Sequence, residues 1–161
     1  MKSFDKITAL FLVGFGLMIL SNKSFAHCEV PCGIYDDSVR VALMYEHITT
    51  IEKAMNSINQ ISEESNPNYN QLVRWIMNKE SHAEKLQEIV SQYFLHQRIK
   101  VADPADQDAY NLYVKHLTLL HEMLVNAMKA KQTTDLSFIE KLRETVHAFE
   151  HSYFGNHEHS H

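Results

Sequence analysis

Apolar residues recur every three or four positions through four long segments of the chain, with short polar stretches between them. This spacing places the apolar side chains on one face of an α-helix. The predicted helices cover about 36–59, 69–98, 105–131 and 135–154. Because only four glycines and three prolines interrupt the whole sequence, the pattern is all-helical.

Each predicted helix carries one apolar stripe, and the four stripes together predict the core. The first stripe is Val41, Met44, Ile48, Ile51, Met55 and Ile58. The second is Leu72, Trp75 or Ile76, Ala83, Leu86, Val90 and Tyr93, with Lys79 interrupting it and with Ile89 and Phe94 beside it. The third is Tyr110, Val114, Leu117, Leu120, Leu124 and Met128, and the fourth is Leu136, Ile139, Leu142, Val146, Phe149 and Tyr153. Short connections favour antiparallel neighbours, so the predicted fold is an up-down four-helix bundle.

Polar residues and prolines mark where the helices begin and end. Asp36 or Asp37 can cap the first helix, because a carboxylate accepts hydrogen bonds from free backbone N–H groups. Residues 62–68 contain a proline and are typical of a loop. Asp103-Pro104 favours a break before the third helix, and Gly155 ends the fourth.

The first 26 residues have the pattern of a secretory signal peptide. Lys2 and Lys6 precede an apolar run over residues 7–20, and Ser24 and Ala26 supply the small residues that signal peptidase reads. The run is short for a membrane anchor, because a bilayer core needs about 20 apolar residues. We expect cleavage after Ala26 and export to the periplasm or the cell exterior, and no later segment resembles a membrane span.

Cleavage would make an acidic chain more acidic. It removes three lysines and one aspartate, which changes the formal charge from −5 to −7. No basic stripe is left to displace the counterions of a phosphate backbone. The sequence therefore predicts no nucleic-acid partner.

Cys28 and Cys32 are the only cysteines, and cleavage would bring them next to the new N-terminus at His27. In an exported protein such a pair favours a disulfide, but a bridge over so short a loop would constrain the unfolded chain little. The alternative is a metal site. His27 would offer an α-amine and an imidazole, Cys28 a thiolate and an amide nitrogen, and Cys32 a second thiolate. Planar nitrogen and sulfur ligation suits nickel or copper better than zinc.

Residues 27–35, which we call the hook, read His27-Cys28-Glu29-Val30-Pro31-Cys32-Gly33-Ile34-Tyr35. They resemble the processed N-terminus of nickel superoxide dismutases, which is His-Cys-x-x-Pro-Cys-Gly-x-Tyr followed by a four-helix bundle. The resemblance continues more loosely through Arg74, Lys79-Glu80 and Tyr93-Phe94. It implies one domain over residues 27–154, preceded by the signal peptide and followed by a histidine-rich tail over 155–161.

The resemblance implies a superoxide dismutase with one nickel ion per subunit, assembled as a homohexamer. The implied nickel ligands are His27, Cys28 and Cys32. Nickel would alternate between its divalent and trivalent states, oxidising one superoxide to dioxygen and reducing the next to hydrogen peroxide. Tyr35 would lie over the open face of the ion and Glu29 would help to set the pocket. An acidic chain would also need local cations to attract superoxide, and Lys79 and Arg74 are candidates.

Two positions depart from the family pattern. In the family a glutamate on the first helix and an arginine on the second orient the axial imidazole, and the counterpart positions here fall on Leu43 and near His82. Glu46, three residues on and on nearly the same helix face, is a possible substitute for the glutamate. Tyr93 is the candidate for the family's second tyrosine near the site.

The remaining histidines leave alternatives open. Those on the helices are expected to be surface or hydrogen-bonded residues rather than ligands: His47, His82, His96, His116, His121 and His147. The tail histidines, His157, His159 and His161, can gather a divalent ion or merely keep the chain end solvated. A second interpretation is an exported nickel- or copper-binding or metal-delivery protein without turnover. A third is a helical interaction module with a disulfide between Cys28 and Cys32.

Overall fold

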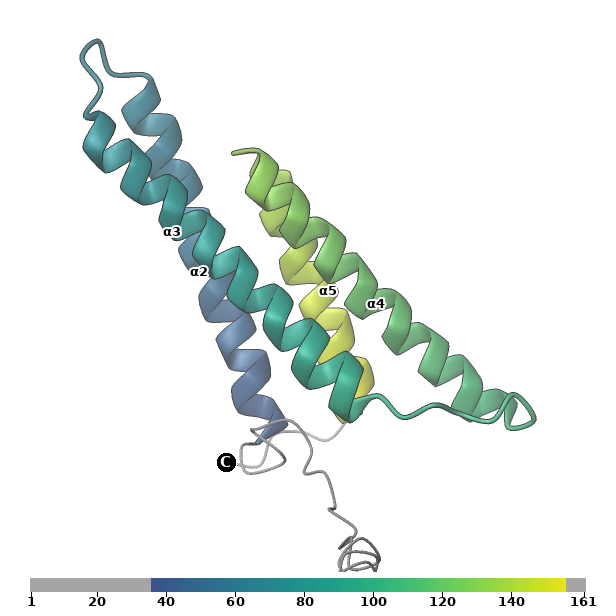
Figure 1. Ribbon diagram of the computed structural model, residues 1–161. Coiled ribbons are helices and arrows are strands. Elements are labelled where there is room, and N and C mark those ends of the chain that lie inside the picture. Colours follow the sequence, from purple (N-terminus) through teal and green to yellow (C-terminus); the bar gives the residue numbers. More distant parts are fainter. Residues whose placement is uncertain (1–35, 156–161) are drawn as a thin grey trace, which may run out of the picture. The chain divides into compact units, whose positions relative to one another are not determined.

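The computed structural model describes residues 36–155, and over this range it is all-helical. The helices are α2 (Asp37–Ser62), α3 (Tyr69–Glu88), α4 (Gln107–Gln132) and α5 (Ser137–Phe154), and a π-helical segment, η1 (Ile89–Arg98), continues α3. Consecutive helices run antiparallel (Figure 1). The predicted four-helix bundle is confirmed for these residues, while the hook lies outside them. Within the described range no helix combines the length and hydropathy that a membrane span requires.

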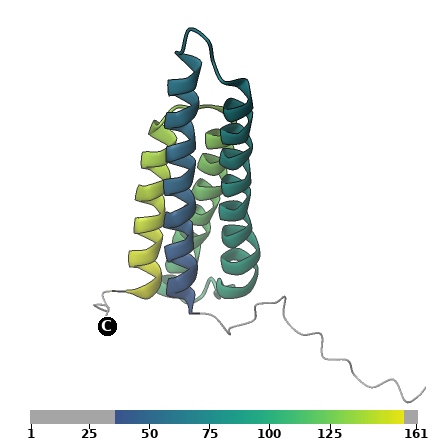
Figure 2. The same cartoon turned by 90° about the vertical axis from the view of Figure 1, so that its left-hand side faces the viewer.

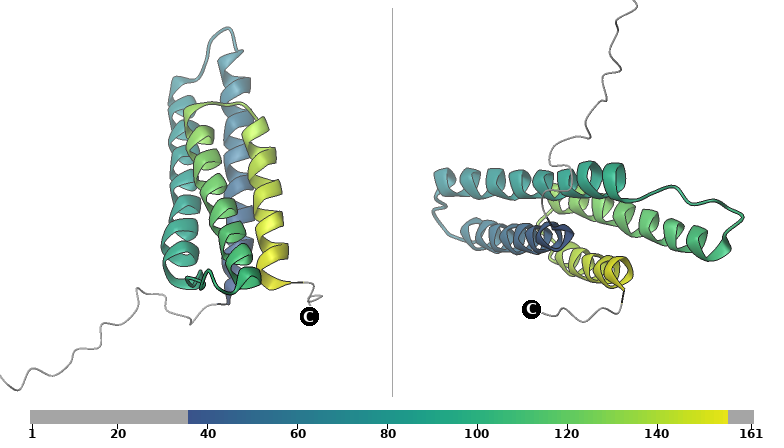
Figure 3. Two further views of the ribbon diagram at one scale, coloured as in Figure 1. Left: turned by 90° about the vertical axis from the view of Figure 1, so that its right-hand side faces the viewer. Right: turned by 90° about the horizontal axis from the view of Figure 1, so that it is seen from below.

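The four helices close a ring around one core. α2 packs on α3, α3 on α4, α4 on α5, and α5 on α2. The start of α2, the end of α5 and the loop over residues 99–106 lie at one end, which we call the entry end because the chain enters the bundle there (Figure 2). The loops over 63–68 and 133–136 lie at the opposite, distal end, where the α2–α3 hairpin extends past the α4–α5 loop (Figure 3).

Three of the four predicted apolar stripes are confirmed as core. All six predicted positions of α2 are buried. The buried residues of α3 and η1 are Lys79, Ala83, Leu86, Ile89, Val90, Tyr93 and Phe94, and those of α5 on the predicted stripe are Ile139, Leu142, Val146 and Phe149. Each large apolar side chain in this set contributes roughly 1.5–3 kcal/mol through its removal from water. Trp75 is only half-buried and Leu136 is exposed, because both lie near the distal end.

The predicted face of α4 was wrong. Val114 and Met128 are exposed, and the buried positions of α4 are instead His116, Leu120, Met123, Ala127 and Ala130. These recur four and three apart, so they form a regular helical stripe. The prediction followed the large apolar residues, whereas two of the five buried positions of α4 are alanines and one is a histidine. Alanine brings helix backbones close together, and the larger Leu117 and Leu124 are left half-buried on the flank.

Side chains cap most of the helix starts. Asp36 is the cap of α2 and accepts a hydrogen bond from the Ser38 backbone N–H at 3.0 Å, so the first of the two predicted candidates is confirmed. Asn68 and Asp106 do the same for α3 and α4. Each such cap stabilises its helix by about 1 kcal/mol. At the end of α5, Gly155 has a φ of 70°, a value that glycine adopts without steric cost.

Lys79 explains how α4 ends. Its side chain is buried, and its Nζ donates hydrogen bonds to the carbonyl oxygens of Lys131 at 2.6 Å and Thr133 at 3.0 Å. The last carbonyls of a helix have no partner within the helix, so the ammonium group satisfies them and complements the negative end of the helix dipole. Burial lowers the pKa of Lys79. The lysine that interrupts the second stripe is therefore a buried helix cap at the distal end.

Candidate functional site

Every residue predicted to hold or cover the metal lies outside the described residues: His27, Cys28, Glu29, Cys32 and Tyr35. What the structure describes is the place where this segment joins the bundle, beginning at Asp36. The tail histidines also lie outside the described range. The described part of the candidate site is therefore the entry end, which begins with Asp36 and Asp37, the two residues that follow the hook.

Asp37 is the centre of a hydrogen-bonded network at the entry end. It lies in the first turn of α2, and its Oδ1 accepts a hydrogen bond from the Tyr93 hydroxyl on η1. Its Oδ2 accepts one from the Tyr153 hydroxyl on α5 at 2.8 Å. Arg98, at the end of η1, pairs with Oδ1 through its Nε at 2.9 Å. The start of α2 is thus tied to two other elements by one carboxylate.

The π-helical backbone of η1 places Tyr93 and Arg98 together. A π-helix bonds each residue to the one five positions on, and the Ile99 N–H donates to the Phe94 carbonyl at 3.0 Å in this way. Tyr93 and Arg98 are also five apart, and an Arg98 Nη2 donates to the Tyr93 hydroxyl oxygen at 2.9 Å. The guanidinium groups of Arg98 and Arg40 lie 4.9 and 5.0 Å from the centroid of the Tyr93 ring, within the range of cation–π attraction.

The electrostatics of the network keep its hydroxyl groups protonated. Burial raises the pKa of Tyr93 and of Tyr153, and the hydrogen bond that each donates to Asp37 raises it further. The hydrogen bond with Tyr93 raises the pKa of Arg98, and the neighbouring Asp37 adds to this shift. At neutral pH the tyrosines are therefore neutral donors and the arginine is a cation. The network holds its protons in place and has none to release near pH 7.

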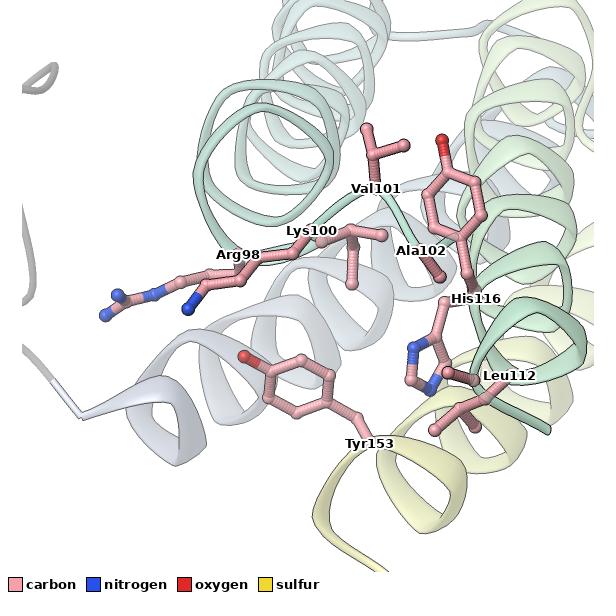
Figure 4. A pocket seen from close by; sticks show the side chains of 10 residues that line it. Arg98, Lys100, Val101, Ala102, Leu112, His116 and Tyr153 are labelled. Carbon is pink, nitrogen blue, oxygen red and sulfur yellow. The ribbon is translucent and has the colours of Figure 1, made fainter. Parts of the chain in front are cut away.

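A cavity of about 340 Å³ adjoins this network (Figure 4). Arg98 and Tyr153 belong both to its lining and to the Asp37 network, and Lys100 adds a second cation. Val101 and Leu112 supply apolar wall. His116 also lines it, with its Nε2 3.2 Å from the Ser152 hydroxyl and its pKa lowered by burial, so this histidine is hydrogen-bonded, as expected.

The cations predicted to attract superoxide are not at the entry end. Lys79 is occupied with the end of α4, and Arg74 is exposed on the distal half of α3, beside a cavity of about 230 Å³. The cations that the structure places near the start of α2 are Arg40, Arg98 and Lys100. Lys79 is a buried residue of an apolar stripe, so few of its atoms are exposed to solvent.

The glutamate and arginine that the resemblance implies have no direct replacement among the described contacts. Leu43, at the position of the family's glutamate, is half-buried and packs against the core. Glu46 is exposed, and His82 pairs with His47 across the α2–α3 interface rather than with Glu46. Tyr93, the candidate for the family's second tyrosine, lies at the entry end, where its hydroxyl donates to Asp37.

Sequence reasoning missed Asp37, Arg98 and Arg40. One signal was available, because a predicted antiparallel bundle brings the start of the first helix and the end of the second to the same end. Opposite charges at those two positions, Asp37 and Arg98, could have been paired on that basis. Over residues 36–155 there is no group of three or more histidine, cysteine or acidic side chains placed to hold a metal ion.

Comparison with known proteins places this geometry in a class. The chain matches the nickel-containing superoxide dismutases over residues 22–157, a stretch that includes the hook and all four helices. The chain belongs to the family of nickel-containing superoxide dismutases. No curated protein and no solved structure matches it.

Proposed function

We propose that this chain is an exported superoxide dismutase that converts superoxide to dioxygen and hydrogen peroxide by Ni(II)/Ni(III) cycling at the hook. The observation that carries the proposal is the family match, which spans the hook together with the bundle. It is supported by the metal-ligand inventory, because the described bundle contains no alternative group of three or more ligands.

The donor set of the hook fits nickel. His27, Cys28 and Cys32 would hold the ion through nitrogen and thiolate donors, which suit nickel better than the hard oxygen ligands of magnesium or calcium. Anionic thiolates also stabilise a higher oxidation state. When bound, nickel would supply the one-electron chemistry that oxidises one superoxide and reduces the next.

The two residues that follow the hook, Asp36 and Asp37, are held in place at the entry end. Tyr35 is the last residue of the hook, Asp36 caps α2 and Asp37 ties the first turn of α2 to Tyr93, Tyr153 and Arg98. These three partners hold the first turn of α2, to which the hook is joined, in one position. We assign the Asp37 network to positioning, and Tyr35 and Glu29 to the pocket over the ion.

Cationic side chains near the start of α2 offset the acidity of the chain there. Superoxide is an anion, and the mature chain would carry a formal charge of −7. Arg40, Arg98 and Lys100 gather at the entry end, where they would raise the local concentration of an anionic substrate. The two protons that hydrogen peroxide needs would come from solvent, since the Tyr93 and Tyr153 hydroxyls stay protonated and bonded to Asp37.

Export and assembly complete the proposal. Signal peptidase would cut after Ala26, which creates the α-amine ligand, and the protein would work in the periplasm or outside the cell as a homohexamer with one nickel per subunit. Exposed apolar side chains on α3 support an assembly: Tyr69, Val73, Ile76 and Met77. They recur four, three and one apart, so they share one face of the helix.

One observation favours the second candidate, an exported metal-binding or delivery protein without turnover. Leu43 stands where the family has a glutamate, so the residue that would orient the imidazole is replaced by an apolar one. A hook that binds nickel but does not hold His27 in register would store or deliver the ion.

Substitution of the thiols tests the nickel site. Replacing Cys28 by serine in the mature chain should lower bound nickel from one ion per chain to almost none and abolish the thiolate-to-nickel absorption, because serine stays protonated at neutral pH. Metal analysis and visible spectroscopy measure both. Met77→Leu is the matched control, since it removes an exposed sulfur of the bundle and should leave nickel unchanged. Full nickel content in a Cys28→Ser/Cys32→Ser double variant would refute the assignment.

A further inference from the structure

Two histidines face each other halfway along the α2–α3 interface. The Nδ1 atoms of His47 and His82 are 3.1 Å apart, and their ring centroids are 5.0 Å apart with an interplanar angle of 72°. Both side chains are half-buried, so the pair has helix on one side and solvent on the other. The family match and the proposed hook chemistry use neither residue.

The distance between the two nitrogen atoms is the distance between neighbouring ligands of one metal ion. Metal–imidazole bonds of ~2.0–2.1 Å that reach two nitrogens 3.1 Å apart enclose an angle of about 100° at the ion. That angle lies between the square and the tetrahedral values. To bind one ion, the two rings would have to rotate so that both Nδ1 lone pairs point at it.

The protonation of the pair also favours a metal ion. Burial lowers the pKa of both rings, the other ring and Lys85 lower that of His47 further, and Glu46 opposes these shifts. Both imidazoles are therefore neutral near pH 7, and one Nδ1–H donates to the other Nδ1. A bound ion takes the place of this proton, which moves through solvent to the Nε2 of the same ring. The pair keeps its net charge, and no proton is released.

We propose that His47 and His82 form a second metal site, which binds a divalent transition-metal ion of the kind imidazole prefers, such as zinc, copper or nickel, with water in the other positions. The structure confirms the expectation that these two histidines are hydrogen-bonded, and the proposal adds a ligand role for the pair. Because only two protein ligands are present, the dissociation constant is on the order of micromolar. The carboxylate of Glu46 lies near enough to act on both rings through its charge and favours the cation, while Lys85 weakens the attraction.

A bound ion would join α2 to α3. The two residues are 35 positions apart in sequence and belong to different helices, so a ligand that holds both stabilises the folded hairpin over the unfolded chain. The site uses no residue of the hook, and its failure would leave the proposed dismutase function untouched.

Zinc titration of the mature, nickel-loaded protein tests the site. The tail histidines are first replaced by alanine so that they do not compete: His157, His159 and His161. Calorimetry should then show one zinc ion per chain with micromolar affinity, and zinc should raise the melting midpoint. In His82→Ala the affinity should fall at least about tenfold and the rise in midpoint should disappear. His121→Ala, which removes an exposed histidine of α4, is the matched control and should behave as the parent.

A second variant distinguishes loss of the zinc ligand from loss of the fold. His82→Asn retains a side chain that hydrogen-bonds to His47 but is a poor zinc ligand, so it should keep the circular dichroism of the parent and still lose zinc. Parent-like zinc affinity in folded His82→Asn, or no zinc bound by the parent without its tail histidines, would overturn the proposal.

Discussion

One alanine added before His27 should abolish superoxide dismutation although both cysteines remain. The extension converts the α-amine of His27 into a peptide nitrogen, whose lone pair is delocalised into the carbonyl group and no longer donates as an amine. Loss of an outer partner of a metal ligand already costs about 10–100-fold, so loss of a direct ligand should cost at least about 100-fold in kcat/KM.

The extended chain is compared with one that carries the same residue at its other end. An alanine after His161 adds equal mass and should leave activity unchanged. Intact mass verifies each N-terminus, and steady-state superoxide decay gives the rates. Parent-level activity in the chain extended before His27 would remove the amine from the ligand set, and with it the reason for cleavage after Ala26.

Asp37→Ala should strongly destabilise the bundle. It removes the acceptor of two tyrosine hydroxyls and the ion-pair partner of Arg98. Because the Asp37 and Arg98 side chains are 23% and 26% exposed, the effect is smaller than for a fully buried pair, and we expect a loss of about 2–4 kcal/mol in the free energy of unfolding. The melting temperature should fall by roughly 10 °C.

Two variants give this prediction its controls. Asp108→Ala removes an exposed aspartate from the first turn of α4, one position further into its helix than Asp37 is in α2, and should cost no more than the helix-dipole term of ~0.3–1 kcal/mol. Asp37→Asn keeps an oxygen acceptor but loses the charge, so its loss should be intermediate. Urea unfolding followed by circular dichroism measures all three. If Asp37→Ala unfolds at the same midpoint as Asp108→Ala, the network does not hold the entry end.

The fold could be predicted from the sequence wherever large apolar residues form the core. Val41 to Ile58 recur with an unbroken helical period, and the helix bounds lie within a few residues of those predicted. The face of α4 did not follow, because the buried Ala127 and Ala130 contribute little hydrophobicity to a pattern dominated by the larger Leu117 and Leu124, which are half-buried. The π-helical form of η1 could not be predicted either, since side-chain periodicity does not report whether backbone hydrogen bonds join residues four or five positions apart.

The candidate site could also be predicted only in part. The metal ligands were predictable because His27, Cys28 and Cys32 are local in sequence and tied to a processing point. The Asp37 network joins residues 56 and 116 positions apart, and only the packed bundle brings them together. For Lys79 the sequence showed only a charge on an apolar stripe, and only the packed bundle shows that its Nζ donates to carbonyl groups at the end of α4.

Superoxide decay catalysed by the mature chain, beginning at His27 and loaded with nickel, tests the central claim most directly. Pulsed generation of superoxide with optical detection gives the decay rate against nickel content. We predict catalytic decay that rises in proportion to bound nickel and is absent from the metal-free chain, with dioxygen and hydrogen peroxide formed in equal amounts. One nickel bound per chain with decay no faster than the uncatalysed reaction would contradict the dismutase assignment and favour a metal-delivery protein.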